Sequence, residues 1–252
     1  TRRLNSSPMQ RLKRWSGRSV GCTEAGLASP VEGPWRLDRL RVHSAGMSEL
    51  LDLLPPGSST DADGMLIIGG CRVDDLAEEF GTPVLVVAED ALRARAREYV
   101  TELTSRWPNA RVVFASKAFP CTAVQRVMVQ EGLGLDVAGG GEILTALKAS
   151  IDPALIVLHG NAKTTEEITM AVEGGVGLIV VDGPDDVDRL EAIVPAGRVQ
   201  DVLVRIIPGV TADTHAHVLT GHEGSKFGLL PEAAAALRTF SVPSTLVRTA
   251  SI

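Results

Sequence analysis

Runs of apolar residues alternate regularly with amphipathic segments from residue 83 onward. Five of these runs have the length and the β-branched content of buried strands. Their first residues are separated by 23, 21, 22 and 24 positions, so the segments between them are nearly equal in length. The predicted strands are 112–116, 135–138, 156–159, 178–181 and 202–206.

The segments between the predicted strands carry apolar residues at three- and four-residue spacing, which is typical of helices packed on one face. A longer helix is expected before the first strand, over about 89–106, after an apolar run at 84–88. Thr164 and Glu167 form the capping-box pattern of a helix start. The predicted connecting helices are 122–131, 142–149, 165–173 and 185–193.

Five strand–helix units in succession predict an α/β fold with a parallel sheet covered by helices. Units of about 22 residues occur both in TIM-type (β/α)8 barrels and in doubly wound sheets, and the spacing alone does not separate the two. A barrel needs eight strands. Only 43 residues follow Gly209, and three further units would take about 66, so we expect about five of eight barrel units in this chain.

Composition and charge place the chain among water-soluble proteins and mark one boundary. It has 44% hydrophobic and 22% charged residues, and no apolar run of about 18 residues that would cross a membrane. Three cysteines, Cys22, Cys71 and Cys121, lie far apart, which argues against a disulfide framework and favours a reducing cytoplasm. Residues 1–46 have a net charge of +6, from nine basic and three acidic residues, and the other 206 have −12. An acidic body of this kind disfavours nucleic acid as a partner.

Residues 1–46 are rich in Arg, Ser, Gly and Pro and show no sustained apolar period, so we expect a disordered extension outside the fold. Two other origins stay open, a transit peptide and translated upstream sequence with Met47 as the natural start. Residues 47–88 are expected to lead into the barrel, residues 89–240 to form it, and residues 241–252 to be a divergent tail.

Lys117 is the most distinctive candidate for chemistry, because it stands at the carboxyl end of the first predicted strand. In α/β barrels that end of the strands is the active-site face. A partly desolvated lysine there is a competent amine nucleophile for an aldehyde. A lysine that extends its charged end from a strand terminus into water is the alternative interpretation of the same position.

The segments around Lys117 resemble the fold-type III pyridoxal-phosphate decarboxylases, the family of diaminopimelate, ornithine and arginine decarboxylases. The resemblance is strongest to the diaminopimelate subgroup, although Gly139 stands where a serine is usual. The matching segments are Phe-Ala-Ser-Lys-Ala at 114–118, Leu-Asp-Val-Ala-Gly-Gly-Gly-Glu at 135–142, His-Gly-Asn-Ala-Lys-Thr at 159–164, Val-Arg-Ile-Ile-Pro-Gly-Val at 204–210, Thr-His at 214–215 and Ser-Lys-Phe-Gly at 225–228.

The resemblance implies roles for four residues. Lys117 is implied as the lysine that carries pyridoxal 5'-phosphate, and Asp136, His159 and Arg205 as residues beside the cofactor. Each of the last three also has a structural interpretation: Asp136 as the cap of the next helix, His159 as a satisfied strand-end histidine, and Arg205 as part of an ion pair on the barrel floor.

Three weaker signals receive structural interpretations. His215, His217 and His222 could ligate a metal, since alternate residues of an extended segment face one way, but a loop role is the expected interpretation. The three glycines at 139–141 follow a strand and precede a helix but lack a phosphate-binding register, so tight turning explains them. Cys71 and Cys121 have no base nearby in sequence and are expected to be structural thiols.

The resemblance implies decarboxylation of meso-diaminopimelate to L-lysine by a cytoplasmic homodimer. Another basic amino acid, or one tethered to a carrier protein, stays open as the substrate. The family's later segments, which include a histidine that stacks on the cofactor, a glycine-rich phosphate loop, a Glu-Pro-Gly-Arg segment and a C-terminal β domain, do not occur in this sequence. A rival interpretation is therefore a truncated chain without catalytic activity, whose open sheet edges promote aggregation.

Overall fold

The computed structural model describes residues 51–207 and 227–237. The chain divides into two compact units, Thr1–Arg95 and Ala96–Ile252, which we describe separately. The expectations for residues 1–46, Met47 and the tail at 241–252 lie outside the described residues, as do those for the histidines at 215, 217 and 222. No helix in the described ranges is long and apolar enough to cross a membrane.

The described part of the first unit contains a small antiparallel sheet followed by a short helix. Its strands β1 (Ser59–Thr60), β2 (Leu66–Ile68) and β3 (Cys71–Arg72) pair in chain order, and α3 (Val73–Phe80) follows at once. Leu76 is the buried residue of α3, and the guanidinium of Arg72 bonds Asp74. The apolar run at 84–88 forms no strand, and Leu85 within it is exposed.

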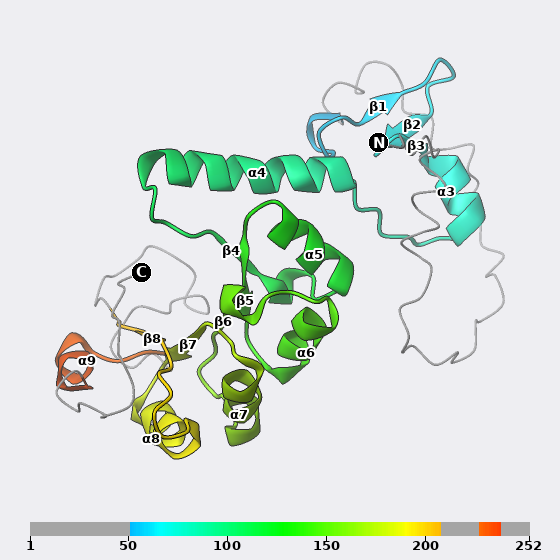
Figure 1. The fold of residues 1–252 in the computed structure, drawn as a ribbon. Helices are drawn as coiled ribbons and strands as arrows, with labels where there is room; N and C mark the ends of the chain where they lie inside the picture. The colour runs from blue at the N-terminus through cyan, green and yellow to red at the C-terminus, as the bar shows by residue number, and fades with distance from the viewer. Residues whose placement is uncertain (1–50, 208–226, 238–252) are drawn as a thin grey trace, which may run out of the picture. The chain divides into compact units, whose positions relative to one another are not determined.

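The described residues of the second unit form five parallel strands, with helices following them in the chain (Figure 1). Helix α4 (Glu89–Arg106), which begins in the first unit, precedes them. The remaining elements are β4 (Val113–Ala115), η3 (Ser116–Ala118), α5 (Thr122–Gln130), β5 (Gly134–Val137), α6 (Gly140–Lys148), η4 (Pro153–Leu155), β6 (Ile156–Leu158), α7 (Thr165–Gly174), β7 (Leu178–Val181), α8 (Pro184–Ile193), β8 (Val202–Val204) and α9 (Pro231–Leu237).

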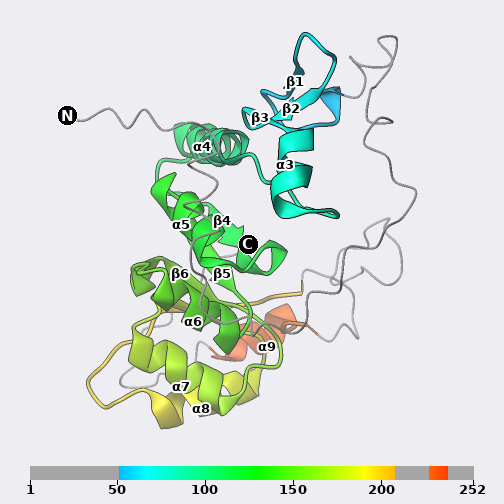
Figure 2. The ribbon, with the colours of Figure 1, turned by 90° about the vertical axis from the view of Figure 1, so that its right-hand side faces the viewer.

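The order of the strands decides between the two architectures that the spacing left open. All five pair in parallel in the sequence order β4-β5-β6-β7-β8. A doubly wound sheet reverses direction after its first strands, whereas a TIM-type barrel adds each strand next to the previous one. Helices α5 to α8 lie in chain order along one side of the strands (Figure 1), and Figure 2 shows the same helices from a second direction. The described strands therefore form part of a barrel wall, as expected.

Alternate residues of each strand face the helices and form the core. Side chains in a strand point to opposite faces in turn, so residues two apart share a face. The core includes Leu135 and Val137 of β5 but not Asp136 between them. The helices contribute Ile143, Ile168, Ala171 and Leu190, among others, and the neighbouring strands contribute Ile156, Leu158, Ile179, Val181 and Val202. Asp136 consequently lies on the face opposite to the helices.

Gly177, just before β7, packs against the backbone of η4 with no room for a side chain. A Cβ added there would lie 2.4 Å from the carbonyl oxygen of Ala154. We expect Gly177→Ala to lower the free energy of unfolding by about 1–3 kcal/mol, since backbone atoms must move. Urea unfolding of Gly177→Ala and the parent measures this loss of free energy. Gly141→Ala is the control, because a Cβ there meets nothing within 4 Å, and an equal loss in both variants would contradict the prediction.

Candidate functional site

The four residues singled out from the sequence stand at the carboxyl ends of the parallel strands. Lys117 lies in η3 directly after β4, Asp136 lies in β5, His159 follows β6, and Arg205 follows β8. Because parallel strands end at the same edge of a sheet, these residues share the edge that carries the active site in α/β barrels.

Lys117 presents an exposed amine at this edge. Its backbone is part of a tight turn in which the Phe119 N–H donates to the Ser116 carbonyl over 3.0 Å. No hydrogen bond or ion pair holds the Lys117 amine among the described residues. The amine is therefore available to a ligand, and its direction depends on the turn beneath it.

Asp136 and His159 come together although 23 residues separate them. Nδ1 of His159 lies 3.4 Å from both carboxylate oxygens of Asp136. The backbone N–H of His159 donates to the Val137 carbonyl over 2.7 Å. This bond continues the β5–β6 ladder and fixes the position from which the imidazole ring extends. Helix α6 has Gly139 as its N-cap with no side-chain cap hydrogen bond, so the interpretation of Asp136 as a helix cap is wrong.

The Arg205 side chain is held by an ion pair with Asp182 and by a contact with the aromatic ring of Phe227. Its Nη1 donates to Oδ1 of Asp182 over 3.1 Å, and its guanidinium carbon lies 4.4 Å from the centroid of the Phe227 ring. The other oxygen of Asp182 accepts the Gly228 N–H over 3.0 Å. Asp182 follows β7, so this ion pair is at the carboxyl edge of the sheet, and its placement on the barrel floor is wrong.

A buried ion pair behind this edge was not predicted. The amine of Lys163, whose side chain is 0% exposed, lies 2.7 Å from Oδ2 of Asp186, which is itself buried. The same amine donates to the Gly160 carbonyl over 2.6 Å, and Arg189 bonds the other Asp186 oxygen over 3.2 Å. These bonds tie the loop that carries His159 to the start of α8. The hydropathy of the sequence does not predict this ion pair, because lysine is seldom fully buried.

An open cavity of about 640 Å³ lies over this ion pair, between the loops that follow β6 and β7. Its walls are residues 161–166, 182–186 and Arg189, which include the first turns of α7 and α8. Three further carboxylates, Glu166, Asp182 and Asp185, line it beside Asp186. These four carboxylates outnumber the two cations of the lining, Lys163 and Arg189, and the excess of negative charge disfavours an anionic ligand at that position.

The three glycines at 139–141 form the start of α6. The Glu167 carboxylate accepts a hydrogen bond from the Gly140 N–H, the group that an anionic ligand would otherwise bind. The Gly140 N–H donates to Oε1 of Glu167 over 2.9 Å, while the Thr164 N–H donates to Oε2 over 2.9 Å. Thr164 and Glu167 complete the predicted capping box of α7. This arrangement supports the tight-turn interpretation. A Cβ at Gly139 would lie 3.0 Å from the same Oε1, which is a crowded position for the usual serine.

The pKa of Glu167 is lowered from its ordinary value, first by the backbone N–H of Thr164 and then by that of Gly140. A carboxyl group with a lowered pKa in the folded state stabilises the fold above its unfolded pKa, and this contribution is lost as the pH falls through the folded pKa. We expect Glu167→Gln to be less stable than the parent at neutral pH. The difference should shrink below about pH 4.3, where the unfolded carboxyl gains its proton.

Urea unfolding of both proteins between neutral and acid pH measures this difference. Glu166→Gln is the matched control, because it removes one charge from the same turn of α7. Among the described residues the Glu166 carboxylate has no hydrogen bond. A stability difference between Glu167→Gln and the parent that stays constant at every pH would contradict the proposed linkage.

Metal ligation and cysteine chemistry find little support in the described residues. No group of three or more His, Cys, Asp or Glu side chains there is arranged to hold a metal ion. Cys71 is buried in the first unit, and burial raises the pKa of its thiol, which makes the thiolate nucleophile scarcer. Cys121 is a free, partly exposed thiol at the N-cap of α5.

Comparison with known proteins assigns most of the second unit to one domain family. Residues 89–245 match the family described as pyridoxal-dependent decarboxylase, pyridoxal binding domain. Diaminopimelate decarboxylase of Mycobacterium tuberculosis is 47% identical over 196 residues, which cover 76% of this chain and 43% of that protein. The Bacillus subtilis enzyme of the same name is 42% identical over 172 residues, 68% of this chain and 39% of that protein.

Solved structures give the same result for the fold. Diaminopimelate decarboxylase of M. jannaschii superposes with a TM-score of 0.67 at 29% identity, over 77% of this chain and 47% of that chain. A second structure of that enzyme, in complex with L-lysine, superposes with a TM-score of 0.66. The chain thus spans less than half the length of the relatives it matches.

Proposed function

We propose, because the chain belongs to the pyridoxal-dependent decarboxylase family and contains its pyridoxal binding domain, that its protein converts meso-diaminopimelate to L-lysine and carbon dioxide. The choice of substrate is supported by the 47% identity to diaminopimelate decarboxylase of M. tuberculosis. It is also supported by the superposition on the M. jannaschii enzyme that was solved with L-lysine.

This proposal rests mainly on the exposed amine of Lys117 at the carboxyl edge of the sheet, which has no hydrogen bond or ion pair to any residue that the structure describes. The residues present suit pyridoxal 5'-phosphate, since an aldehyde needs an accessible amine and an anionic cofactor needs nearby positive charge. Lys117 would hold the cofactor, and Asp136, His159 and Arg205 would lie beside it. When bound, the cofactor supplies an electron sink for the bond that breaks as carbon dioxide leaves.

Each residue has a separate task in this proposal. The Lys117 amine would hold the cofactor through its aldehyde group and would carry a proton at the same edge. His159, placed by Asp136 and by its own backbone hydrogen bond, would present its imidazole ring beside the cofactor. Arg205 provides a fixed positive charge for a carboxylate or phosphate. Its guanidinium has five N–H donors, more than the bond to Asp182 uses.

The proposal extends to location and assembly. We place the protein in the cytoplasm as a homodimer acting on a small amino acid, with neither nucleic acid nor membrane as a partner. The net charge of −12 outside residues 1–46 supports the exclusion of nucleic acid, since phosphate groups are repelled by an acidic surface.

Release of labelled carbon dioxide from carboxyl-labelled meso-diaminopimelate, with and without added pyridoxal phosphate, tests the proposed function. We expect cofactor-dependent release together with L-lysine in equal amount. L-Lysine and L-ornithine as substrates form the comparison. Release from one of these and none from meso-diaminopimelate would replace the proposed substrate, whereas no release from any amino acid would support a chain without catalytic activity.

A further inference from the structure

We propose that Gln125 is a positioning residue that aims Lys117 through a buried hydrogen bond to Ser116. This inference rests on the proposed role of Lys117 and adds a residue of α5 to it. Gln125 and Ser116 are each 0% exposed, and Nε2 of Gln125 donates to the Ser116 hydroxyl over 2.6 Å. Ser116 is the residue immediately before Lys117.

The hydrogen bond joins α5 to the turn that carries the amine. In that turn the Phe119 N–H donates to the Ser116 carbonyl over 3.0 Å, and the Cys121 N–H donates to the Phe119 carbonyl over 2.9 Å. The Gln125 N–H then donates to the Cys121 carbonyl over 3.1 Å. These backbone and side-chain hydrogen bonds therefore connect Ser116 with Gln125 into a closed hydrogen-bonded loop, and Lys117 belongs to this loop.

The direction of the Lys117 side chain depends on this hydrogen-bonded loop, because the side chain has no protein partner of its own among the described residues. The direction of an unpaired side chain is set by its backbone and by whatever ligand it meets. A shift of the turn by about 1 Å would be enough to spoil an attack geometry that requires near contact between the reacting atoms.

Stability does not explain why a glutamine occupies this position. Its Oε1 is a buried side-chain atom without a hydrogen-bond partner in the described structure. A buried acceptor left unpaired costs free energy, and replacing a buried polar pair with apolar groups of similar shape is often neutral or stabilising. A side chain that weakens the core yet bonds the residue next to Lys117 points to a role in orientation.

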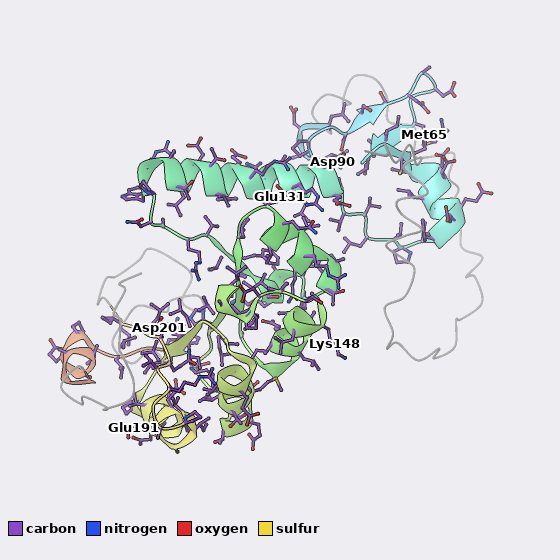
Figure 3. The ribbon with its side chains drawn as sticks, viewed as in Figure 1. Met65, Asp90, Glu131, Lys148, Glu191 and Asp201 are labelled. Carbon is purple, nitrogen blue, oxygen red and sulfur yellow. The ribbon has the colours of Figure 1, made fainter. Side chains whose placement is uncertain are left out.

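The test measures how selectively pyridoxal phosphate with borohydride labels Lys117 in the full chain, by peptide mapping, relative to Lys148. Lys148 is exposed at the C-terminal end of α6 and serves as an internal reference (Figure 3). We expect Gln125→Met, a close match in shape, to lower the ratio of Lys117 to Lys148 labelling about five-fold, as for loss of one hydrogen bond. Its urea unfolding midpoint should change little, because the variant removes the unpaired Oε1 but leaves the Ser116 hydroxyl without its donor.

Ser116→Ala should lower the labelling ratio by a similar factor, and the double variant should lower it no further, because both changes remove the same bond. Gln200→Met is the matched control. Gln200 is another buried glutamine, whose Nε2 donates to the Val176 and Asp201 carbonyls away from Lys117. This variant should lose stability and keep the parent's labelling ratio.

Different outcomes separate the two proposals. A parent protein that labels Lys117 no better than Lys148 would overturn the proposed function. A parent with strong preference for Lys117, combined with an unchanged ratio in both Gln125→Met and Ser116→Ala, would overturn the positioning role alone. The positioning role would also be wrong if the labelling ratio fell only in proportion to lost stability and Gln200→Met gave the same fall. Gln125 would then be a residue of the core without a role in orientation.

Discussion

Lys117→Ala is expected to reduce decarboxylation by about 10²- to 10⁴-fold, because it removes the amine proposed to attack the cofactor and to carry the proton. The labelled peptide that contains residue 117 should disappear from the borohydride map. Stability should change by no more than about 0.5 kcal/mol, since the side chain is exposed and has no hydrogen bond or ion pair to lose among the described residues.

Lys148→Ala is the matched control for Lys117→Ala. It also removes an exposed lysine, but from the C-terminal end of α6, which lies at the opposite edge of the sheet because helix and strand run in opposite directions. We expect unchanged decarboxylation there. If Lys117→Ala keeps both its activity and its cofactor label, a different lysine carries the cofactor and the proposed site is wrong.

Lys163→Met is expected to lower the free energy of unfolding by about 3 kcal/mol, near the lower end of the range for breaking a buried ion pair. The change leaves the Asp186 carboxylate buried without its nearest cation, which lies 2.7 Å away in the parent. Arg189 and the Asp182 N–H still bond Asp186, at 3.2 and 3.0 Å, and this partial compensation places the loss at the lower end.

Urea unfolding with a common slope for parent and variant measures the loss in Lys163→Met. Lys148→Met, an exposed lysine of the same unit, should change the free energy by no more than about 0.5 kcal/mol. Lys163→Met combined with Asp186→Leu should recover most of the loss, because no unpaired charge stays buried. A double variant as unstable as the single one would show that the loss comes from packing and not from charge.

The ion pair between Arg97 and Glu131 is a useful contrast to the buried pair. It joins α4 to Glu131, which follows α5 and is labelled in Figure 3, over 2.8 Å. The Arg97 side chain is 57% exposed and that of Glu131 is 11% exposed. A pair with its cation in water contributes little, because water screens the charge and the long arginine side chain loses freedom. Distance alone therefore does not rank the two pairs; burial does.

The local sequence was enough to predict most elements of the second unit. Four-residue apolar runs such as 178–181 have few alternatives to a buried strand, and the capping box at Thr164 and Glu167 located the start of α7 to the residue. Both signals depend on neighbours in the chain. The same reasoning missed the small sheet of the first unit, whose two- and three-residue strands are too short to show a period.

The sequence by itself determined the repeating strand–helix units and the position of Lys117 at a strand end. Only the tertiary structure decided that the strands pair in chain order, that Asp136 meets His159, that Arg205 meets Asp182, and that Lys163 is buried against Asp186. Each of these three pairs joins residues 23 positions apart, about one strand–helix unit. Their approach follows from the parallel register of neighbouring strands, which depends on how the whole sheet packs and not on the residues next to each partner.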